Sequence, residues 1–498
     1  MSTARLLVID AGTTGTRALI FDENSTVLAT SYTEFPQYHP QPDRVEHDAQ
    51  EIWESTQSMV KGALEQADLK PADITAIGIT DQRATTVVWD KRTGDPITRA
   101  IVWQDTRTAG RVDELAKAWG DRVYAHTGWS LAPVYSSLSL EWILNNVHGA
   151  RELADAGHLA FGTIDSWLIH RLTGGTEHVI SASNASVTGS YDLLSDQWYE
   201  EWLTALGIPL SMYPEVRDDS GHLGTTDPAV FGAAVPIASA IADQHAALFA
   251  QGCIEAGMVK CTHGTGTFLD MNIGTTPVID TSSGLTCQIA WRMNGETVYS
   301  LEGYAASTGA AVQWLRDGAA IINTSSDSEA LARTVPDNGG VYFVPALTGL
   351  SAPYWDSYAR GMIIGISPGT KRGHLARATL EGIVYSVRDF IDTMGSVSGN
   401  EISQIAVDGG ASKNDFLMQF QADQLGVEVF RPENTEATSL GAALLAGLAV
   451  GVWPTAKDAL ATQRIEATFT PRSSDEVRAT QYDGWRRAVA RAQGWAKK

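Results

Sequence analysis

The fold is decided near the start of the chain, by Arg5-Leu6-Leu7-Val8-Ile9-Asp10-Ala11-Gly12-Thr13-Thr14-Gly15-Thr16-Arg17. An apolar run ends in an acid and is followed by glycines and threonines, and a second apolar run covers Ala18 to Asp22. This pattern predicts a β-hairpin whose turn lies at Gly12 to Gly15. Asn24 and Ser25 then turn the chain into a third strand, Thr26 to Ala29.

A related pattern returns in the second half of the sequence. Strand-like runs at Met258 to Cys261 and Phe268 to Met271 flank the turn Gly264-Thr265-Gly266-Thr267, and Gly274 precedes a third run, Val278 to Asp280. We interpret this as an internal duplication in which each half opens with a hairpin.

Between the hairpins, strand-like and helical segments alternate, which predicts an α/β fold with mostly buried sheets. The expected strands are Ile74 to Thr80, Ile101 to Trp103, Val341 to Pro345 and Ile405 to Asp408. The expected helices are Asp48 to Ala67, Gly110 to Trp119, His374 to Met394 and a buried one within Leu440 to Trp453. We place a domain boundary near residue 250, which gives domains 1–250 and 251–498.

Composition excludes several classes of protein. The chain has 498 residues and a formal charge of −22, without clusters of Lys and Arg, which argues against nucleic acid as a partner. Three cysteines without C-x-x-C spacing fit neither a disulfide framework nor a structural zinc site, so we expect a cytoplasmic location. We expect no signal peptide and no membrane span, because the longest apolar stretch is shorter than the roughly 20 residues that a bilayer requires.

The glycine- and threonine-rich turns are the first candidates for chemistry. Glycines let backbone N–H groups approach phosphate oxygens, threonine hydroxyls add donors, and Arg17 supplies a fixed charge. Asp10 can hold a metal ion through water. Taken alone, each turn is better explained as an ordinary hairpin turn, but two of them in equivalent positions of a duplicated fold would face each other across a cleft. A third turn, Val407 to Asn414, has a glycine pair against which a flat ring can lie.

These three elements, in this order and spacing, resemble the FGGY family of carbohydrate kinases. The segments Gly361 to Ile366 and His374 to Glu381 resemble that family's second signature. Similarity to the members that phosphorylate glycerol covers nearly the whole chain, and the particularly close stretches are Val45–Asp48, Ile101–Gln104, Phe161–Ile169, Gln313–Asp317, Ala352–Asp356 and Phe416–Gln421. The resemblance implies two actin-like (ribonuclease H-like) ATPase domains with a cleft between them. It also implies ATP and Mg²⁺, a small polyol as the substrate, and a homo-oligomer, dimer or tetramer.

Site residues follow from the same resemblance. Asp243 matches the catalytic base, which would orient an alcohol and take its proton. The residues matched to the acceptor polyol are Arg83, Gln244, Trp103 and Phe268, with Tyr135 as a further candidate. Those matched to the nucleotide are Thr13, Thr14, Arg17, Thr265, Gly309, Gln313, Gly410 and Asn414. Asp10 and Asp243 would neighbour the Mg²⁺. No Walker A or protein-kinase signature occurs, so neither a P-loop NTPase nor a protein kinase is indicated.

The sequence departs from the family around the polyol. Ala84 stands where a glutamate is usual, Val134 replaces a tyrosine, Ser139 replaces a lysine and His245 replaces a glutamine. These changes leave open a larger polyol or ketose, such as a tetritol, as the acceptor, and a nucleotide-binding relative without activity is a further alternative. Asp270 is unusual for its position and is a candidate for the missing carboxylate.

Overall fold

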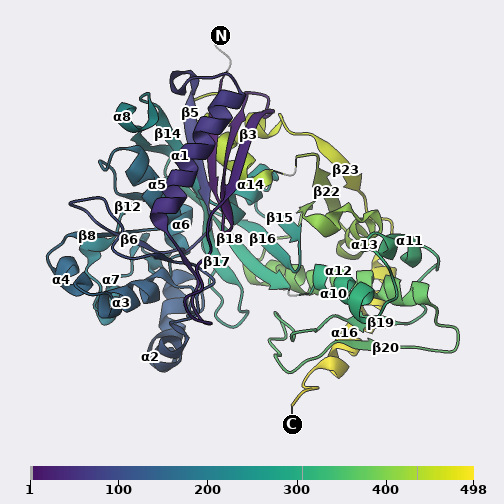
Figure 1. Cartoon of the computed structure of the whole chain (residues 1–498). Helices are drawn as coiled ribbons and strands as arrows, with labels where there is room; N and C mark the ends of the chain where they lie inside the picture. The colour runs from purple at the N-terminus through teal and green to yellow at the C-terminus, as the bar shows by residue number, and fades with distance from the viewer. Residues whose placement is uncertain (1–3, 306, 435, 498) are drawn as a thin grey trace.

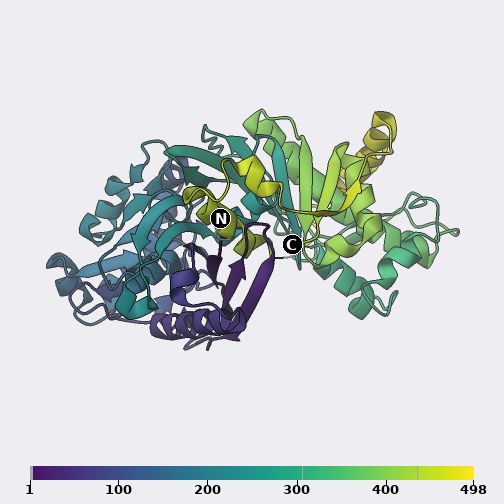
Figure 2. The same cartoon turned by 90° about the horizontal axis from the view of Figure 1, so that it is seen from above.

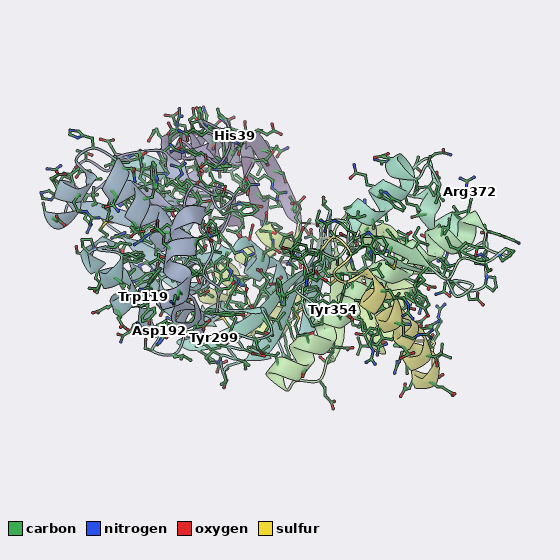
Figure 3. All side chains as sticks on the ribbon, turned by 90° about the horizontal axis from the view of Figure 1, so that it is seen from below. His39, Trp119, Asp192, Tyr299, Tyr354 and Arg372 are labelled. Atoms are coloured by element: carbon green, nitrogen blue, oxygen red, sulfur yellow. The ribbon has the colours of Figure 1, made fainter. Side chains whose placement is uncertain are left out.

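The computed structural model describes residues 4–305, 307–434 and 436–497, which form two lobes lying side by side (Figure 1, Figure 2). We call residues 4–250 the first half and residues 251–497 the second half. His39 lies on one lobe and Arg372 on the other (Figure 3). Within the described residues, no helix combines the length and apolar character that a bilayer crossing requires.

The first half is built on a sheet whose first three strands form an antiparallel meander. Two further strands run parallel to β1, and an antiparallel strand completes the order β3-β2-β1-β5-β14-β13. The strands are β1 (Leu6–Ala11), β2 (Gly15–Phe21), β3 (Val27–Glu34), β5 (Ala76–Asp81), β13 (Ser220–Thr225) and β14 (Pro236–Ala242). The first three confirm the predicted hairpin and its third strand.

The second half repeats this order as β18-β16-β15-β21-β22-β23, with the same directions at each pairing. Its strands are β15 (Met258–His263), β16 (Thr267–Gly274), β17 (Thr286–Met293), β18 (Glu296–Ala305), β21 (Gln404–Asp408), β22 (Glu428–Pro432) and β23 (Ile465–Phe469). The internal duplication is therefore confirmed, but one strand was predicted wrongly. Residues Val278 to Asp280 are not in a strand, and β18 takes the place that corresponds to β3.

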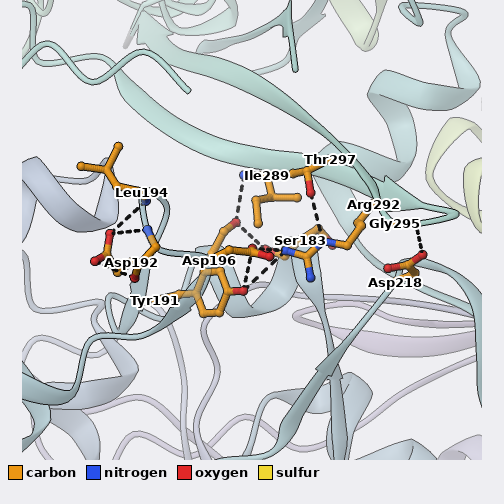
Figure 4. A network of polar contacts seen from close by, with 12 residues as sticks. Ser183, Tyr191, Asp192, Leu194, Asp196, Asp218, Ile289, Arg292, Gly295 and Thr297 are labelled. Carbon is orange, nitrogen blue, oxygen red and sulfur yellow. Dashed lines mark hydrogen bonds and ion pairs between the residues drawn. The ribbon is translucent and has the colours of Figure 1, made fainter. Parts of the chain in front are cut away.

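The two halves join edge to edge into one 13-stranded sheet. β17 pairs in parallel with β13 through Met293 and Ser220. Beside this pair, the carboxylate of Asp219 accepts the backbone N–H of Arg292 at 2.7 Å and that of Ser183 at 3.0 Å, and the Arg292 guanidinium contacts Asp196 (Figure 4). Burial raises the pKa of Asp219 to about 7. This joint is thus a satisfied polar network and not a flexible linker.

The helices cover both faces of the sheet, and a largely helical insertion follows β5. They are α1 (Ala49–Gln66), α2 (Ala109–Thr127), α3 (Ser136–Asn146), α4 (Ala150–Asp155), α5 (Ile164–Leu172), α6 (Ala182–Ser186), α7 (Glu200–Ala205), α8 (Pro228–Phe231), α9 (Asp243–Ala250), α10 (Gly309–Gln313), α11 (Asp327–Ala332), α12 (Arg372–Ser398), α13 (Asp415–Leu425), α14 (Ala437–Ala449), α15 (Ala456–Leu460) and α16 (Asp475–Ala492). Shorter strands are β4 (Glu46–His47), β6 (Val87–Asp90), β7 (Ala100–Ile101), β8 (Leu159–Gly162), β9 (Val179–Ser181), β10 (Tyr191–Asp192), β11 (Gln197–Trp198), β12 (Glu215–Arg217), β19 (Tyr342–Val344) and β20 (Met362–Ile364).

Helix α14 belongs to the second half in sequence but packs on the sheet of the first half (Figure 1). Its glycine and alanines allow a very close approach: a Cβ on Gly441 would lie 2.0 Å from the carbonyl oxygen of Ala246 in α9. Ser239 of β14 donates to the Ala442 carbonyl at 2.7 Å. The predicted buried helix in this region is therefore confirmed, and it fixes α9, which begins at Asp243.

Candidate active site

The first glycine-rich turn connects β1 to β2 and is closed by a bond from the Gly12 N–H to the Gly15 carbonyl at 3.0 Å. Gly15 has no room for a side chain, because its Cβ would lie 2.3 Å from the Thr33 carbonyl oxygen on β3. Thr14 is exposed at the tip. Trp103 donates its indole N–H to the Thr13 hydroxyl at 3.1 Å. The turn thus presents free hydroxyl and backbone groups on a rigid support.

The second turn, between β15 and β16, repeats this construction. The Gly264 N–H donates to the Gly266 carbonyl at 2.9 Å, and a Cβ on Gly266 would lie 2.7 Å from the Ala305 carbonyl on β18. Helix α10 starts directly over the turn, since the Gly309 N–H donates to the Gly264 carbonyl at 3.0 Å. Thr265 is exposed, as Thr14 is in the first turn.

A cavity of about 650 Å³ opens beside the second turn. It brings together five residues that the sequence assigned to the nucleotide: Thr265, Gly309, Gln313, Gly410 and Asn414. A Cβ on Gly410 would find no heavy atom within 4 Å, so the absent side chain leaves open wall against which a flat ring fits. Asn414 accepts the Leu417 N–H at 2.9 Å, which caps α13 and fixes its carboxamide at the edge of the cavity.

Asp10 lies at the end of β1, buried between the two halves. Its carboxylate accepts from Arg17 at 2.8 Å and from the Ser439 hydroxyl of α14 at 2.8 Å. Arg17 also lies 2.5 Å from Glu436. Burial raises the pKa of Asp10, and Arg17 opposes that shift. Sequence reasoning missed Glu436 and Ser439, because nothing local in a Gly- and Ala-rich helix shows that it lies on the opposite half.

We call the residues that the sequence matched to the acceptor polyol and to the base the acceptor group: Arg83, Trp103, Asp243, Gln244 and Phe268. Asp243 is the first residue of α9. Arg83 approaches it, with its Nε 3.7 Å from Asp243 Oδ1, and the Gln244 N–H donates to the same oxygen at 2.7 Å. Burial raises the pKa of Asp243, while Arg83 lowers it. Trp103 and Phe268 are 42% and 36% exposed, so part of each aromatic ring is open to solvent.

The backbone beside Arg83 is strained. Ala84 has a φ of 61°, in the left-handed region that L-residues other than Asn and Asp seldom adopt, and it is 2% exposed. Its carbonyl accepts from the Ser136 hydroxyl at 2.9 Å, which holds this conformation.

Few protein ligands are available for a metal ion at this site. Across the described ranges, no group of three or more His, Cys, Asp or Glu side chains is arranged to hold a metal ion. Burial raises the pKa of Asp243 and the charge of Asp10 adds to that shift, so the two carboxylates interact electrostatically. This donor set fits Mg²⁺, which binds through one or two carboxylates and otherwise keeps water and phosphate oxygens.

Two candidates are placed differently from the sequence expectation. Tyr135 is fully buried at the start of α3, with its hydroxyl bonded to the Trp129 carbonyl and to Thr127, so the structure does not bring it to the acceptor group. Asp270 does not supply a carboxylate to Arg83, because it is paired with Lys260 at 2.9 Å.

The carboxylate that meets Arg83 is Glu302 of β18, at 2.7 Å, and the side-chain amide oxygen of Gln288 accepts from Arg83 at 3.0 Å. Sequence reasoning missed both residues. The strand register places Glu302 opposite Asp270. Glu302 could therefore have been found only by predicting that β16 pairs with β18.

Comparison with known proteins gives the family. The chain matches the model of the FGGY family of carbohydrate kinases, N-terminal domain, over residues 5–250, and that of the C-terminal domain over residues 259–450. It is 49% identical to a glycerol kinase of Petrotoga mobilis over 491 residues, 98% of each chain, and 49% identical to glycerol kinase 2 of Thermotoga maritima over 494 residues, 99% of each.

Solved structures agree with this assignment. The structure of Plasmodium falciparum glycerol kinase with ADP matches with a TM-score of 0.93 and 31% identity over 98% of each chain. Gluconate kinase from Lactobacillus acidophilus, at 23% identity and a TM-score of 0.86 over 99% of each chain, shares the fold. The two-domain actin-like architecture expected from the sequence is therefore confirmed, and the chain belongs to the FGGY family of carbohydrate kinases.

Proposed function

We propose that this enzyme transfers the γ-phosphate of MgATP to a terminal hydroxyl of glycerol, giving glycerol 3-phosphate and ADP. The observation that carries the proposal is the placement of Asp243 beside Arg83, within one assembly that also contains the two threonine-tipped turns. Relatives that match nearly the full length at 49% identity are named glycerol kinase, which supports glycerol as the acceptor.

Asp243 acts as the general base in this proposal. Its Oδ1 is engaged by the Gln244 N–H, which leaves Oδ2 to accept a hydrogen bond from the acceptor alcohol. Because burial raises its pKa, the carboxylate is a stronger base than an exposed one, and it takes the hydroxyl proton as the oxygen bonds to phosphorus. Arg83 stays cationic, since Glu302 and Asp243 raise its pKa against the opposing effect of burial, and it donates to the remaining hydroxyls.

In this proposal both turns would hold the nucleotide. Gly410 and Asn414, which line the cavity, would hold the adenosine. Thr265 and Gly309 on one side, and Thr13, Thr14 and Arg17 on the other, would hold the phosphates. Mg²⁺, held near Asp10 and Asp243, would supply charge neutralisation to the phosphate oxygens. Backbone N–H groups and hydroxyls fixed before the substrate arrives stabilise charge without reorganising, and this is the main electrostatic contribution of such a site.

We also propose that residues 1–250 and 251–498 are the two functional domains. The first would hold the acceptor and part of the phosphates, and the second the adenosine. The repeated strand order supports this division.

The variant Asp243→Asn tests the base. Asn retains an oxygen that accepts the Gln244 N–H, so we expect an intact fold, ATP binding unchanged by calorimetry, and phosphoryl transfer lower by about 10²–10⁴-fold. Asp165→Asn is the matched control, because Asp165 is also buried with a raised pKa but accepts from Ser181 in the core. Normal turnover by Asp243→Asn would refute the assignment.

The acceptor is tested separately, by ADP release with glycerol, erythritol, threitol, xylulose and dihydroxyacetone. We expect the highest kcat/KM with glycerol. A higher value for a longer polyol or a ketose would overturn glycerol specificity but leave the kinase chemistry standing, whereas ATP binding without turnover on any acceptor would favour the relative without activity.

A further inference from the structure

A buried ion pair lies directly behind the acceptor group. Lys260 on β15 and Asp270 on β16 are cross-strand partners, and their side chains are 1% and 0% exposed. The ammonium lies 2.9 Å from Asp270 Oδ2. Removing two charges from water is unfavourable even when they are paired, so burying an ion pair does not by itself make the fold more stable. A role other than stabilisation is therefore worth seeking for this pair.

The same ammonium reaches across the junction between the halves. Lys260 Nζ lies 2.6 Å from Gln244 Oε1, on the residue that follows Asp243. An ammonium has only donors, so the atom of the carboxamide that meets it must be the oxygen. The Gln244 NH₂ group is thereby directed away from Lys260, and it has no hydrogen bond to the described part of the protein.

The charges around Lys260 keep it protonated. Burial lowers the pKa of Lys260, but Asp270, Asp408 and Glu302 together raise it above the ordinary value. It therefore stays an ammonium at neutral pH, and the orientation that it imposes on Gln244 does not vary with protonation.

Arg83, another residue of the acceptor group, is also held by a side chain from the second half. The strand register places Lys260, Asp270 and Glu302 in one row across β15, β16 and β18, and Glu302 contacts Arg83. Strands of the second half thus hold both Gln244 and Arg83 of the first half.

We propose that Lys260 is a positioning residue for the acceptor: it fixes the Gln244 carboxamide so that its NH₂ group donates to an acceptor hydroxyl, and Asp270 is present to neutralise the buried ammonium. This inference rests on the proposed function, because it takes Gln244 as an acceptor-binding residue. It adds a role for a pair that otherwise only fills the core.

The test replaces the pair together. Lys260→Met alone leaves Asp270 as an unpaired buried charge and should lower stability. Lys260→Met combined with Asp270→Leu removes both charges, and we expect thermal stability to return to that of the wild type. The KM for the acceptor should nevertheless stay raised by up to about tenfold, the upper end for one hydrogen bond between uncharged groups, with the KM for ATP unchanged. Recovery of a wild-type acceptor KM by the double variant would show a merely structural role and overturn the proposal.

A second variant tests the same proposal without requiring that the Lys260→Met, Asp270→Leu protein folds. Gln244→Glu keeps an oxygen for Lys260 but replaces the NH₂ donor by an acceptor, so the acceptor KM should rise at unchanged stability. An unchanged KM would overturn the proposal. Adding Gln244→Leu to the double variant should produce no further rise if Lys260 acts through Gln244, and an additive rise would contradict it. Wild-type turnover in the same assay tests the proposed function independently.

Discussion

Replacing Gly309 with alanine tests whether the second turn binds nucleotide, by moving that turn without altering any side chain on it. An added Cβ would lie 2.6 Å from the Gly264 carbonyl oxygen, whereas ordinary contact begins at 3.4 Å, so the turn and α10 must separate by 3.4 − 2.6 = 0.8 Å. Overpacking of this kind costs about 1–3 kcal/mol, and the gain in helix propensity from Gly to Ala offsets about 1 kcal/mol. Net destabilisation is thus about 0–2 kcal/mol.

Activity should fall further than stability does. A displacement approaching 1 Å in a positioning loop can lower a rate by about 10²-fold, so we expect kcat/KM for MgATP to fall by at least about tenfold. The assay measures ADP release against ATP concentration, together with urea unfolding. Gly110→Ala in α2 is the matched control, because its Cβ would meet nothing within 4 Å. Normal kcat/KM in a folded Gly309→Ala protein would refute the role given to this turn.

Four further outcomes follow from the contacts. Gly410→Ala should leave the unfolding midpoint unchanged, since the added Cβ meets no protein atom within 4 Å. It should weaken ATP binding measured by calorimetry, and an unchanged affinity would show that adenosine does not lie against Gly410. Gly441→Ala should lower the unfolding free energy by about 1–3 kcal/mol or more, because its Cβ would lie 2.0 Å from the Ala246 carbonyl, and an unchanged urea midpoint would contradict the packing of α14 on α9. Arg17→Gln removes a cationic partner of the buried Asp10 carboxylate, and the pKa of Asp10 should rise further. Because Arg17 itself is 35% exposed and solvent screens the pair, we expect the unfolding free energy to fall by about 1–2 kcal/mol, and an unchanged urea midpoint would show that the pair does not stabilise the fold. Burial lowers the pKa of His178 to about 4, so between pH 6.5 and 4 the unfolded state binds a proton that the native state does not, and the free energy of unfolding falls as pH falls. His178→Gln should reduce that slope by up to about 1.4 kcal/mol per pH unit, measured by urea unfolding at a series of pH values. A slope identical to that of the wild type would show that His178 is solvated in the native state.

Much of the fold could be predicted from local pattern. Apolar runs that end at glycine- and threonine-rich turns predicted both hairpins, since burial and turn chemistry act within about ten residues there. The third strand of the second meander was missed, although Asn294 and Gly295 carry a signal for it. Both have positive φ, 53° and 75°, and Asn-Gly is the preferred dipeptide of a tight hairpin turn, here joining β17 to β18.

The candidate site divides in the same way. The turns themselves were found from local pattern. The family resemblance assigned the individual nucleotide residues, and the structure gathers five of these around one cavity. Glu302, Gln288 and Lys260 were not found, since their relation to Arg83 and Gln244 exists only through strand pairing and the contact between halves. The placement of Tyr135 at the acceptor was wrong for a related reason. The sequence around Tyr135 does not show that its hydroxyl is already hydrogen-bonded to Thr127 and to the Trp129 carbonyl inside the core.

The packing of α14 has a consequence for synthesis of the chain on the ribosome. Leu6 and Val8 of β1 share a core with Leu440 and Leu444 of α14, so one face of the first sheet stays bare until residue 449 has been made. The last strand of that sheet before α9 ends at Ala242, which leaves 449 − 242 = 207 residues still to be translated. At about 5–20 residues per second this takes roughly 10–40 s. During that interval the nascent first half exposes an apolar surface that is prone to aggregation.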